Sequence, residues 1–330
     1  MRIAIDAMGG DHAPESIIEG AVSASKEAAR GTTLVLVGKE KQIKAHLSRY
    51  NSASRSIEIV NASETITMDD APVAAVRKKT DSSIVRIIDL LKERQVEAAF
   101  SAGNTGAVVA AAKLKLRTLL GVERPALATI LPNLKGLSVL VDAGANSDCK
   151  PQHLLQFAIM GHVYARNILR KNNPSIGLMN IGEEASKGNG LTREVFKLLE
   201  QKKFNFLGNI EGLDVFNGKV DVIICDGFVG NVIIKVSESV AFALQQIFKE
   251  EICKRPLAKL GSLLIKPALK ALIKKTDCAE YGGAPLLGIN GVCIIGHGNS
   301  SPRAIQNGIK MAEEFVDHRI NDHIAQEINC

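Results

Sequence analysis

Residues 2–14 read RIAIDAMGGDHAP, and this stretch sets a pattern that the rest of the chain repeats. The run from Arg2 to Ala7 has the composition of a short buried strand. The glycine-rich turn after it suits a loop, and Pro14 favours the first turn of a following helix. A strand, a loop and a helix in succession form the unit of a parallel sheet, so the chain is expected to be an α/β protein.

The same unit recurs along the chain and predicts a mainly parallel, doubly wound sheet in an α/β/α sandwich. The expected strands are Arg2 to Ala7, Thr33 to Val37, Ile57 to Val60, Glu97 to Ser101, Leu127 to Leu131, Leu137 to Val141, Ser175 to Asn180, Val220 to Cys225 and Val292 to Ile295. Asp81-Ser82-Ser83 offers N-cap chemistry for one helix. The turn Asn133 to Gly136 predicts a hairpin, and thus one antiparallel excursion.

The composition favours a compact globular enzyme. The 330 residues are 46% hydrophobic and 4% aromatic, without Trp, which suits parallel strands covered by helices rather than an aromatic-rich binding module. No linker or repeat divides the chain, so residues 1–330 are expected to form a single α/β/α domain with a helical projection over about 237–276. The start shows no secretion signal, and no uncharged apolar stretch is long enough to span a membrane; the protein is expected to be cytoplasmic.

Metal and nucleic-acid partners are not expected. The six cysteines form no CxxC pair and the seven histidines no HExxH pair, so the sequence predicts no metal site. The net charge is +6, but seven basic and no acidic residues fall between Ile252 and Lys275, which leaves the remainder nearly neutral. Nucleic-acid binding needs a broader basic face, so the basicity belongs to one local element.

Polar side chains follow the strands where anions usually bind in parallel sheets. Because the carboxyl ends of parallel strands meet at one edge, we expect these loops to build one anion-holding pocket there. The candidate substrate-binding residues are Asp6, Gly9, Gly10, Asp11, Ser101, Gly103, Asn104, Thr105, Gly106, Asp142, Asn146 and Ser300. The loops that hold Lys187, Asp226, Asn231 and His297 supply the candidate catalytic side chains.

Each of these residues also has an ordinary structural interpretation. Asp226 suits a helix N-terminus, Lys187 a solvated surface and His297 a capped loop, while the glycine-rich loops suit tight turns. The segment Gly296 to Ser301 resembles a dinucleotide fingerprint, but Ser301 stands at its third glycine position and no acidic residue closes a strand about 20 residues further on. A nicotinamide site therefore has weak support.

Taken together, seven motifs resemble the phosphate acyltransferase family of bacterial phospholipid synthesis, which makes acyl phosphate from acyl-acyl carrier protein. They are DAMGGDHAP at Asp6 to Pro14, SAGNTGA at Ser101 to Ala107, DAGAN at Asp142 to Asn146, NIGEEASKG at Asn180 to Gly188, DVIICDGFVGNVIIK at Asp221 to Lys235, YGGAPLLGING at Tyr281 to Gly291 and HGNSS at His297 to Ser301. They stand in register along nearly the whole chain. His12 departs from the pattern, where Asn is more usual.

This resemblance implies a Rossmann-like α/β/α homodimer without a cofactor, which uses acyl carrier protein and inorganic phosphate and passes its product to a downstream acyl phosphate-using acyltransferase. Phosphate is itself a nucleophile and a thiolate an adequate leaving group, so no covalent relay is required. Positioning and oxyanion stabilisation are required. We expect Lys187 and Asn231 to stabilise the charge at phosphate or the thioester oxygen, with Asp226 and His297 orienting them.

The basic segment from Pro256 to Lys275 mixes lysines with leucines, as interfacial helices on anionic lipid do. We expect peripheral membrane contact there through Leu260, Leu264, Ile265, Lys266, Leu269 and Lys270. A helix at a dimer contact and a docking face for acyl carrier protein are alternatives. For the whole chain, the alternatives are an NAD-dependent hydroxyacid dehydrogenase of isopropylmalate dehydrogenase-like fold and a non-enzymatic lipid-surface scaffold.

Overall fold

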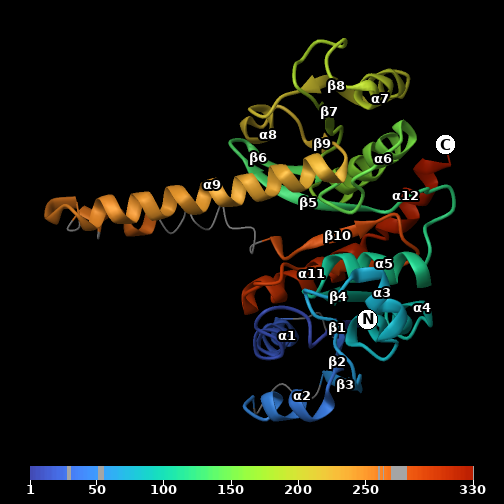
Figure 1. Cartoon of the computed structure of the whole chain (residues 1–330), viewed down its shortest axis with the longest axis vertical. Helices are drawn as coiled ribbons and strands as arrows, with labels where there is room; N and C mark the ends of the chain where they lie inside the picture. The colour runs from blue at the N-terminus through green and yellow to red at the C-terminus, as the bar shows by residue number, and fades with distance from the viewer. Residues whose placement is uncertain (28–30, 51–55, 259–260, 263, 269–280, 330) are drawn as a thin grey trace.

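The computed structural model describes residues 1–27, 31–50, 56–258, 261–262, 264–268 and 281–329. Its strands are β1 (Arg2–Asp6), β2 (Thr33–Gly38), β3 (Ile57–Asn61), β4 (Ala98–Ser101), β5 (Ala126–Asn133), β6 (Gly136–Val141), β7 (Ser175–Met179), β8 (Asn205–Ile210), β9 (Val222–Ile224), β10 (Ala284–Leu287) and β11 (Val292–Ile295). In the described ranges they form one 11-stranded sheet in the order β3-β2-β1-β4-β11-β10-β5-β6-β9-β7-β8 (Figure 1). The predicted α/β class is confirmed.

Helices cover both faces of this sheet. They are α1 (Glu15–Glu27), α2 (Glu40–Leu47), α3 (Pro72–Lys78), α4 (Ser83–Lys92), α5 (Thr105–Lys115), α6 (Pro151–Asn167), α7 (Gly190–Glu200), α8 (Asp214–Asn217), α9 (Gly227–Cys253), α11 (Pro302–Asp317) and α12 (Ile320–Ile328). Successive side chains of a strand point to opposite faces. Accordingly, Ile3 and Ile5 of β1 pack with α1 and α11, whereas Ala4 packs with α4 and α5.

All nine predicted strands exist, with ends shifted by up to two residues, and the hairpin between β5 and β6 is antiparallel as predicted. Two strands were not predicted. Strand β8 contains Gly208 in the left-handed region (φ 96°), and β10 contains Pro285. Both residues weaken a strand pattern. Within the segment Asp81-Ser82-Ser83, which is expected to cap a helix, Ser82 is the N-cap of α4, but its hydroxyl caps no backbone group.

Three successive antiparallel pairs reverse the direction of the sheet. Strand β10 pairs antiparallel with both β11 and β5, and β5 pairs antiparallel with β6. Strands β6, β9, β7 and β8 therefore run opposite to β1, β2, β3, β4 and β11. The expected single antiparallel excursion is wrong. The prediction that all the candidate loops meet at one edge of the sheet is wrong as well. The carboxyl ends of the two groups of strands point in opposite directions.

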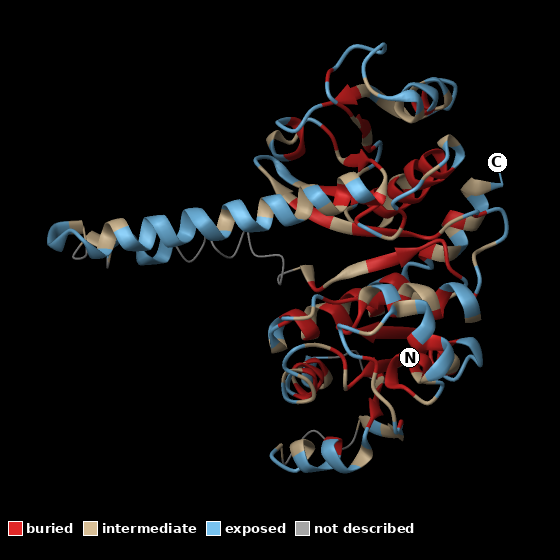
Figure 2. Ribbon diagram, in the orientation of Figure 1, coloured by how far each residue is buried: buried red, intermediate tan, exposed pale blue. Residues whose placement is uncertain are grey.

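Helix α9 projects from the body of the molecule, and most of its surface is exposed (Figures 1 and 2). It begins about ten residues before the predicted projection. Beyond it, residues 256–258, 261–262 and 264–268 are helical, while the rest of the predicted projection to residue 276 falls outside the described residues. By length and composition alone, α9 could cross a membrane, so the expectation that no segment could do so was too strong.

Candidate active site

The six candidate loops divide into two sets of three. The first set follows β1, β4 and β11, and consists of residues 6–14, 101–107 and 296–301. The second set follows β6, β7 and β9, and consists of residues 142–146, 180–188 and 226–231. Within each set the parent strands are parallel and lie near one another in the sheet. No hydrogen bond or ion pair in the described part of the chain joins the two sets.

The carboxylate of Asp6 holds the first set together from below. Its Oδ2 accepts a hydrogen bond from Ser101 Oγ (2.7 Å), its Oδ1 accepts one from the Met8 N–H (3.0 Å), and Ser83 also donates to it. The Ser101 hydroxyl in turn accepts the Gly103 N–H (3.1 Å). Complete burial raises the pKa of Asp6, against these hydrogen bonds, which lower it. Asp6 and Ser101 therefore shape the loops rather than face solvent.

Glycine is required where the first-set loops touch. A Cβ on Gly9 would lie 2.7 Å from the backbone nitrogen of Gly103, too close for any other residue. Gly10 has a φ of 107°, and the N–H of Asp11 donates to Gly298 O at 2.7 Å. The three loops thus form a continuous backbone surface.

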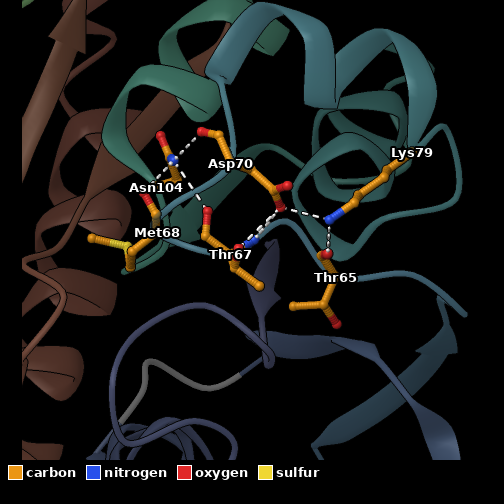
Figure 3. Close-up of polar contacts among 6 residues, drawn as sticks. All are labelled: Thr65, Thr67, Met68, Asp70, Lys79 and Asn104. Atoms are coloured by element: carbon orange, nitrogen blue, oxygen red, sulfur yellow. Dashed lines mark hydrogen bonds and ion pairs between the residues drawn. The ribbon is translucent and has the colours of Figure 1, made fainter.

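Asn104 is fully engaged inside the protein. Its Oδ1 accepts the Ala107 N–H (3.0 Å), which caps α5, and its Nδ2 lies 3.1–3.2 Å from three backbone oxygens that accept from it, those of Thr67, Met68 and Asp70 (Figure 3). Thr105 and Gly106 follow as the first helical residues, whose N–H groups have no partner inside a helix. An anion at this end of α5 would therefore meet backbone donors and not the Asn104 amide.

Sequence reasoning missed the segment that Asn104 holds. Lys79 Nζ donates to Thr65 O (3.0 Å) and pairs with Asp70 Oδ2 (2.5 Å), which also accepts the Thr67 N–H (2.7 Å) (Figure 3). The hydrogen bond from Lys79 is the main reason why the pKa of Asp70 is lowered. The residues between β3 and α3 carry no glycine-rich pattern, so only long-range contacts reveal that they belong to this set.

The remaining first-set candidates lie at its surface. Asp11 and His297 are exposed, whereas Ser300 is buried and its N–H donates to His297 O (3.0 Å). The structure thus leaves the side chains of Asp11 and His297 accessible to a ligand above the loops.

Asp142 organises the second set in the way that Asp6 organises the first. Its carboxylate accepts four backbone N–H groups and the Asn146 side-chain amide, at 2.8–3.2 Å. The four backbone donors are Leu127, Gly144, Ala145 and Asn146. Burial nevertheless raises the pKa of Asp142. Asn146 also donates to Pro125 O (2.7 Å), so both side chains are occupied.

The loop into α9 packs directly on this carboxylate turn. Asp226 Oδ1 accepts the Val229 N–H (2.8 Å) and so caps α9, which is the ordinary interpretation of this residue. A Cβ on Gly144 would stand 3.5–3.7 Å from three atoms of the Asn231 side chain. The half-buried Asn231 therefore lies over the Gly144 turn, and its side chain forms no hydrogen bond with another described residue.

Lys187 lies on the neighbouring loop of the same set. Its N–H donates to Glu184 O (3.0 Å), and its carbonyl accepts Asn180 Nδ2 (3.2 Å), so its backbone is held. Its side chain is exposed and forms no ion pair with another described residue. Strand β7 adjoins β9, so Lys187 and Asn231 follow neighbouring parallel strands, as the sequence hypothesis requires.

Two thiols near the second set are unsuited to be nucleophiles. Burial and the nearby carboxylates of Asp142 and Asp226 raise the pKa of Cys149 to about 12, and the same causes raise that of Cys225. Both would therefore be protonated at neutral pH, and only a thiolate attacks readily.

The two sets border one hydrophobic cluster. Ala107 and Val108 of α5 belong to it together with Ala143, and Ala145 and Ile234 of α9 pack against it. The two sets of loops are thus connected through packing, although they follow strands that run in opposite directions. Two cavities lie elsewhere: one of about 300 Å³ between α7 and β8, and one of about 470 Å³ at the amino end of β4.

Of the predicted membrane contacts, Leu264, Ile265 and Lys266 are exposed. Leu260, Leu269 and Lys270 lie outside the described residues.

Comparison with known proteins identifies close relatives over nearly the whole chain. A family model described as "Fatty acid synthesis protein" matches residues 1–323. The chain is 50% identical over 328 residues to the phosphate acyltransferase of Pelotomaculum thermopropionicum, covering 99% of this chain and 95% of that protein. It is 51% identical over 326 residues to the phosphate acyltransferase of Syntrophotalea carbinolica, covering 99% and 93%.

Solved structures agree on the fold. A phosphotransacetylase from Streptococcus pyogenes has a TM-score of 0.61 and 16% identity, covering 100% of this chain and 94% of that one. A phosphotransacetylase from Staphylococcus aureus has a TM-score of 0.59 and 14% identity, covering 99% and 94%. At such low identity the likeness concerns the fold alone.

Proposed function

Because this chain belongs to the phosphate acyltransferase family, and is therefore an acyltransferase of lipid biosynthesis, we propose that it transfers a fatty acyl group from acyl carrier protein to inorganic phosphate. The observation that carries this proposal is the roughly half-identical sequence of named phosphate acyltransferases over 99% of the chain. The dehydrogenase and scaffold alternatives receive no support from these relatives.

The reaction needs no enzyme nucleophile. A phosphate oxygen attacks the thioester carbonyl carbon, the carbonyl oxygen becomes an oxyanion, and the carbon–sulfur bond breaks to release the carrier thiolate. The raised pKa of Cys149 supports this direct route, since a protonated thiol would not compete with phosphate. The protein's task is then to hold two partners and stabilise one negative charge.

The first-set loops are suited to hold phosphate. Gly103, which lies two residues before α5, packs against Gly9, and Asp6 and Ser101 keep these loops in place from beneath the backbone donors that open α5. Backbone donors bind a dianion without carrying a charge of their own that would have to be desolvated. His297 would orient phosphate from the rim.

The second-set side chains are suited to stabilise the oxyanion. Among the described residues, the Lys187 ammonium group forms no ion pair and the Asn231 side-chain amide forms no hydrogen bond. Asp226 would orient them indirectly, because its hydrogen bond to Val229 fixes the start of the helix that carries Asn231. Transfer would occur between the two sets, beside the hydrophobic cluster that they share.

A homodimer through α9 is the assembly that we propose. Phe228, Val232, Val236, Val240, Leu244 and Phe248 follow one another every four residues and are 45–67% exposed. Such a row forms a ridge that packs into the grooves of another helix. A second copy offers the matching ridge and would remove this apolar surface from water.

Peripheral attachment to anionic membranes is proposed for the segment beyond α9, in an otherwise cytoplasmic protein. Leu257 and Leu264 are 85% and 84% exposed there, and Lys266 is exposed near them. Leucines can enter the interface while lysine contacts anionic headgroups. This position would deliver a lipid-soluble product to a membrane-bound acyltransferase that consumes acyl phosphate.

The decisive experiment incubates the enzyme with palmitoyl-acyl carrier protein and ³²P-labelled inorganic phosphate. We expect labelled palmitoyl phosphate and one free carrier thiol per acyl group transferred. Palmitate release without labelled product would show hydrolysis and would refute the proposed acceptor.

A further inference from the structure

We propose that Met68 is a specificity-determining residue, which contacts the acyl chain of the thioester next to the reacting group. Because this role presupposes the proposed acyl transfer, the experiment below separates the two. The side chain lies on the segment from Ser63 to Asp70, between β3 and α3, which no sequence motif had connected with the site.

The backbone around Met68 is held unusually firmly for an exposed loop. Asn104 Nδ2 lies within hydrogen-bonding distance of the carbonyls of Thr67 (3.1 Å) and Met68 (3.1 Å) and of Asp70 (3.2 Å) (Figure 3). At the other end, Ser63 N and Oγ donate to Asp81 Oδ2 at 2.9 and 2.6 Å. The backbone position of Met68 is therefore set by the same side-chain amide that caps α5.

The Met68 side chain lies where two first-set loops meet. A Cβ on Gly298 would stand 3.2 Å from Met68 Cε and 3.4–3.5 Å from both carboxylate oxygens of Asp11. Gly298 and Asp11 are joined by the 2.7 Å hydrogen bond between their backbones. The methyl group is thus adjacent to the rim of the proposed phosphate cradle.

The chemistry of this place favours an apolar ligand. Met68 is 50% exposed although it is apolar, and the carbonyl oxygens of Thr67, Met68 and Asp70 already accept from Asn104. Beside the exposed side chains of Thr67 and Asp69, this part of the segment offers a ligand one apolar group, a flexible thioether that adapts to alkyl chains. A thioester whose carbonyl carbon faces phosphate held by the first-set loops would place the start of its alkyl chain here.

The test measures kcat/KM with octanoyl-, lauroyl- and palmitoyl-acyl carrier protein for wild type, Met68→Ala and Met68→Leu. We expect Met68→Ala to lower kcat/KM at least about fivefold for palmitoyl and less than about twofold for octanoyl, mainly through KM, because lost apolar contact scales with chain length. Met68→Leu, of similar volume, should stay within about twofold of wild type. Leu134→Ala, an 88% exposed leucine in the β5–β6 turn, is the matched control and should have no effect.

Met68→Gln keeps the length of the side chain and removes its apolar end, so it should lose activity with palmitoyl-acyl carrier protein as Met68→Ala does. If one of the two variants folds poorly, the other still tests the contact. An equal fall at all three lengths, or no fall in either variant, would overturn the role of Met68 while wild-type activity upholds acyl transfer. A wild-type protein that forms no acyl phosphate at any length would refute the proposed function itself.

Discussion

Two strand-end aspartates show how single residues shape the site. Asp6 is the last residue of β1 and Asp142 directly follows β6. Both are fully buried and accept the N–H of the residue two positions further on, Met8 and Gly144. The sequence hypothesis placed both in contact with substrate. Because both are buried, we propose that they act as positioning residues, each of which turns a backbone loop so that its outer surface can meet a ligand.

Asp142→Asn should lower the free energy of unfolding by about 3 kcal/mol. The carboxylate accepts five hydrogen bonds, and an amide nitrogen in place of one oxygen would leave buried N–H groups facing a donor. Urea unfolding of Asp142→Asn and of the exposed neighbour Asp148→Asn measures this difference. Asp148→Asn should stay within about 0.5 kcal/mol of wild type, and an equal loss in both variants would contradict the role of Asp142.

The titration of Asp6 should make stability depend on pH. Burial raises its pKa in the folded protein above the ordinary value of 3.8, so the folded state holds this proton more tightly than the unfolded chain does. The contribution of Asp6 is therefore most favourable below about pH 4 and declines as the pH rises through the raised pKa. Asp6→Asn should remove that decline. The urea midpoint of unfolding is measured from pH 4 to 7 for wild type and Asp6→Asn. If the midpoint changes with pH equally in both proteins, Asp6 does not titrate in this range.

Lys187→Ala and Asn231→Ala should each slow acyl phosphate formation at least about tenfold, because each would remove one contact to the developing charge. Steady-state kcat and kcat/KM for palmitoyl-acyl carrier protein measure the effect. Lys197→Ala, on helix α7, serves as a control for the loss of a lysine away from these loops. Unchanged turnover in both site variants would exclude them from the mechanism.

At the scale of elements, α9 joins the site to the proposed assembly. Near its start it carries Asn231 over the Gly144 turn, and its remaining turns extend away from the sheet and are mostly exposed (Figure 2). These turns carry the ridge of apolar side chains. A helix of 27 residues is about 40 Å long, so one element can hold a site residue at one end and an interface along the rest.

Leu244→Glu should convert a dimer into a monomer, since a charge in the middle of the ridge would be buried without a partner. Light scattering coupled to size-exclusion chromatography would give the mass. Leu134→Glu introduces the same charge on an exposed leucine of the β5–β6 turn and should remain dimeric. A monomeric wild type, or an unchanged mass in Leu244→Glu, would refute the α9 interface.

At the scale of the whole molecule, the reversal of the sheet decides how the loops are shared. Strands β10 and β5 lie between two bodies of parallel strands that point in opposite directions, so each body presents its own three loops. The two substrates of the proposed reaction would accordingly be held by different bodies. Holding phosphate on one body and the acyl thioester on the other suits this reaction, because the carrier protein then has to approach only one side of the site.

The whole protein should partition onto liposomes that contain anionic phospholipid. Leu257→Glu combined with Leu264→Glu should reduce co-sedimentation severalfold, because two exposed leucines would become charged at the proposed lipid surface. The combination Leu120→Glu and Leu134→Glu alters leucines of similar exposure, 85% and 88%, elsewhere on the surface and should bind as wild type does. Equal sedimentation of both double variants would count against membrane contact by this segment.

The local sequence determined the elements of this protein, because apolar alternation, helical periodicity and glycine-rich turns act over a few residues. Nine strands, the β5–β6 hairpin and the positions of the six loops follow from it. The family resemblance was also evident in the sequence, since its motifs lie in order along the chain. Tertiary structure alone decided which loops meet, because that depends on β10, a short strand containing Pro285 that pairs with a distant part of the chain at Leu127. It also decided that the amide of Asn104 faces backbone carbonyls and not a ligand, since those carbonyls come from a segment more than thirty residues earlier.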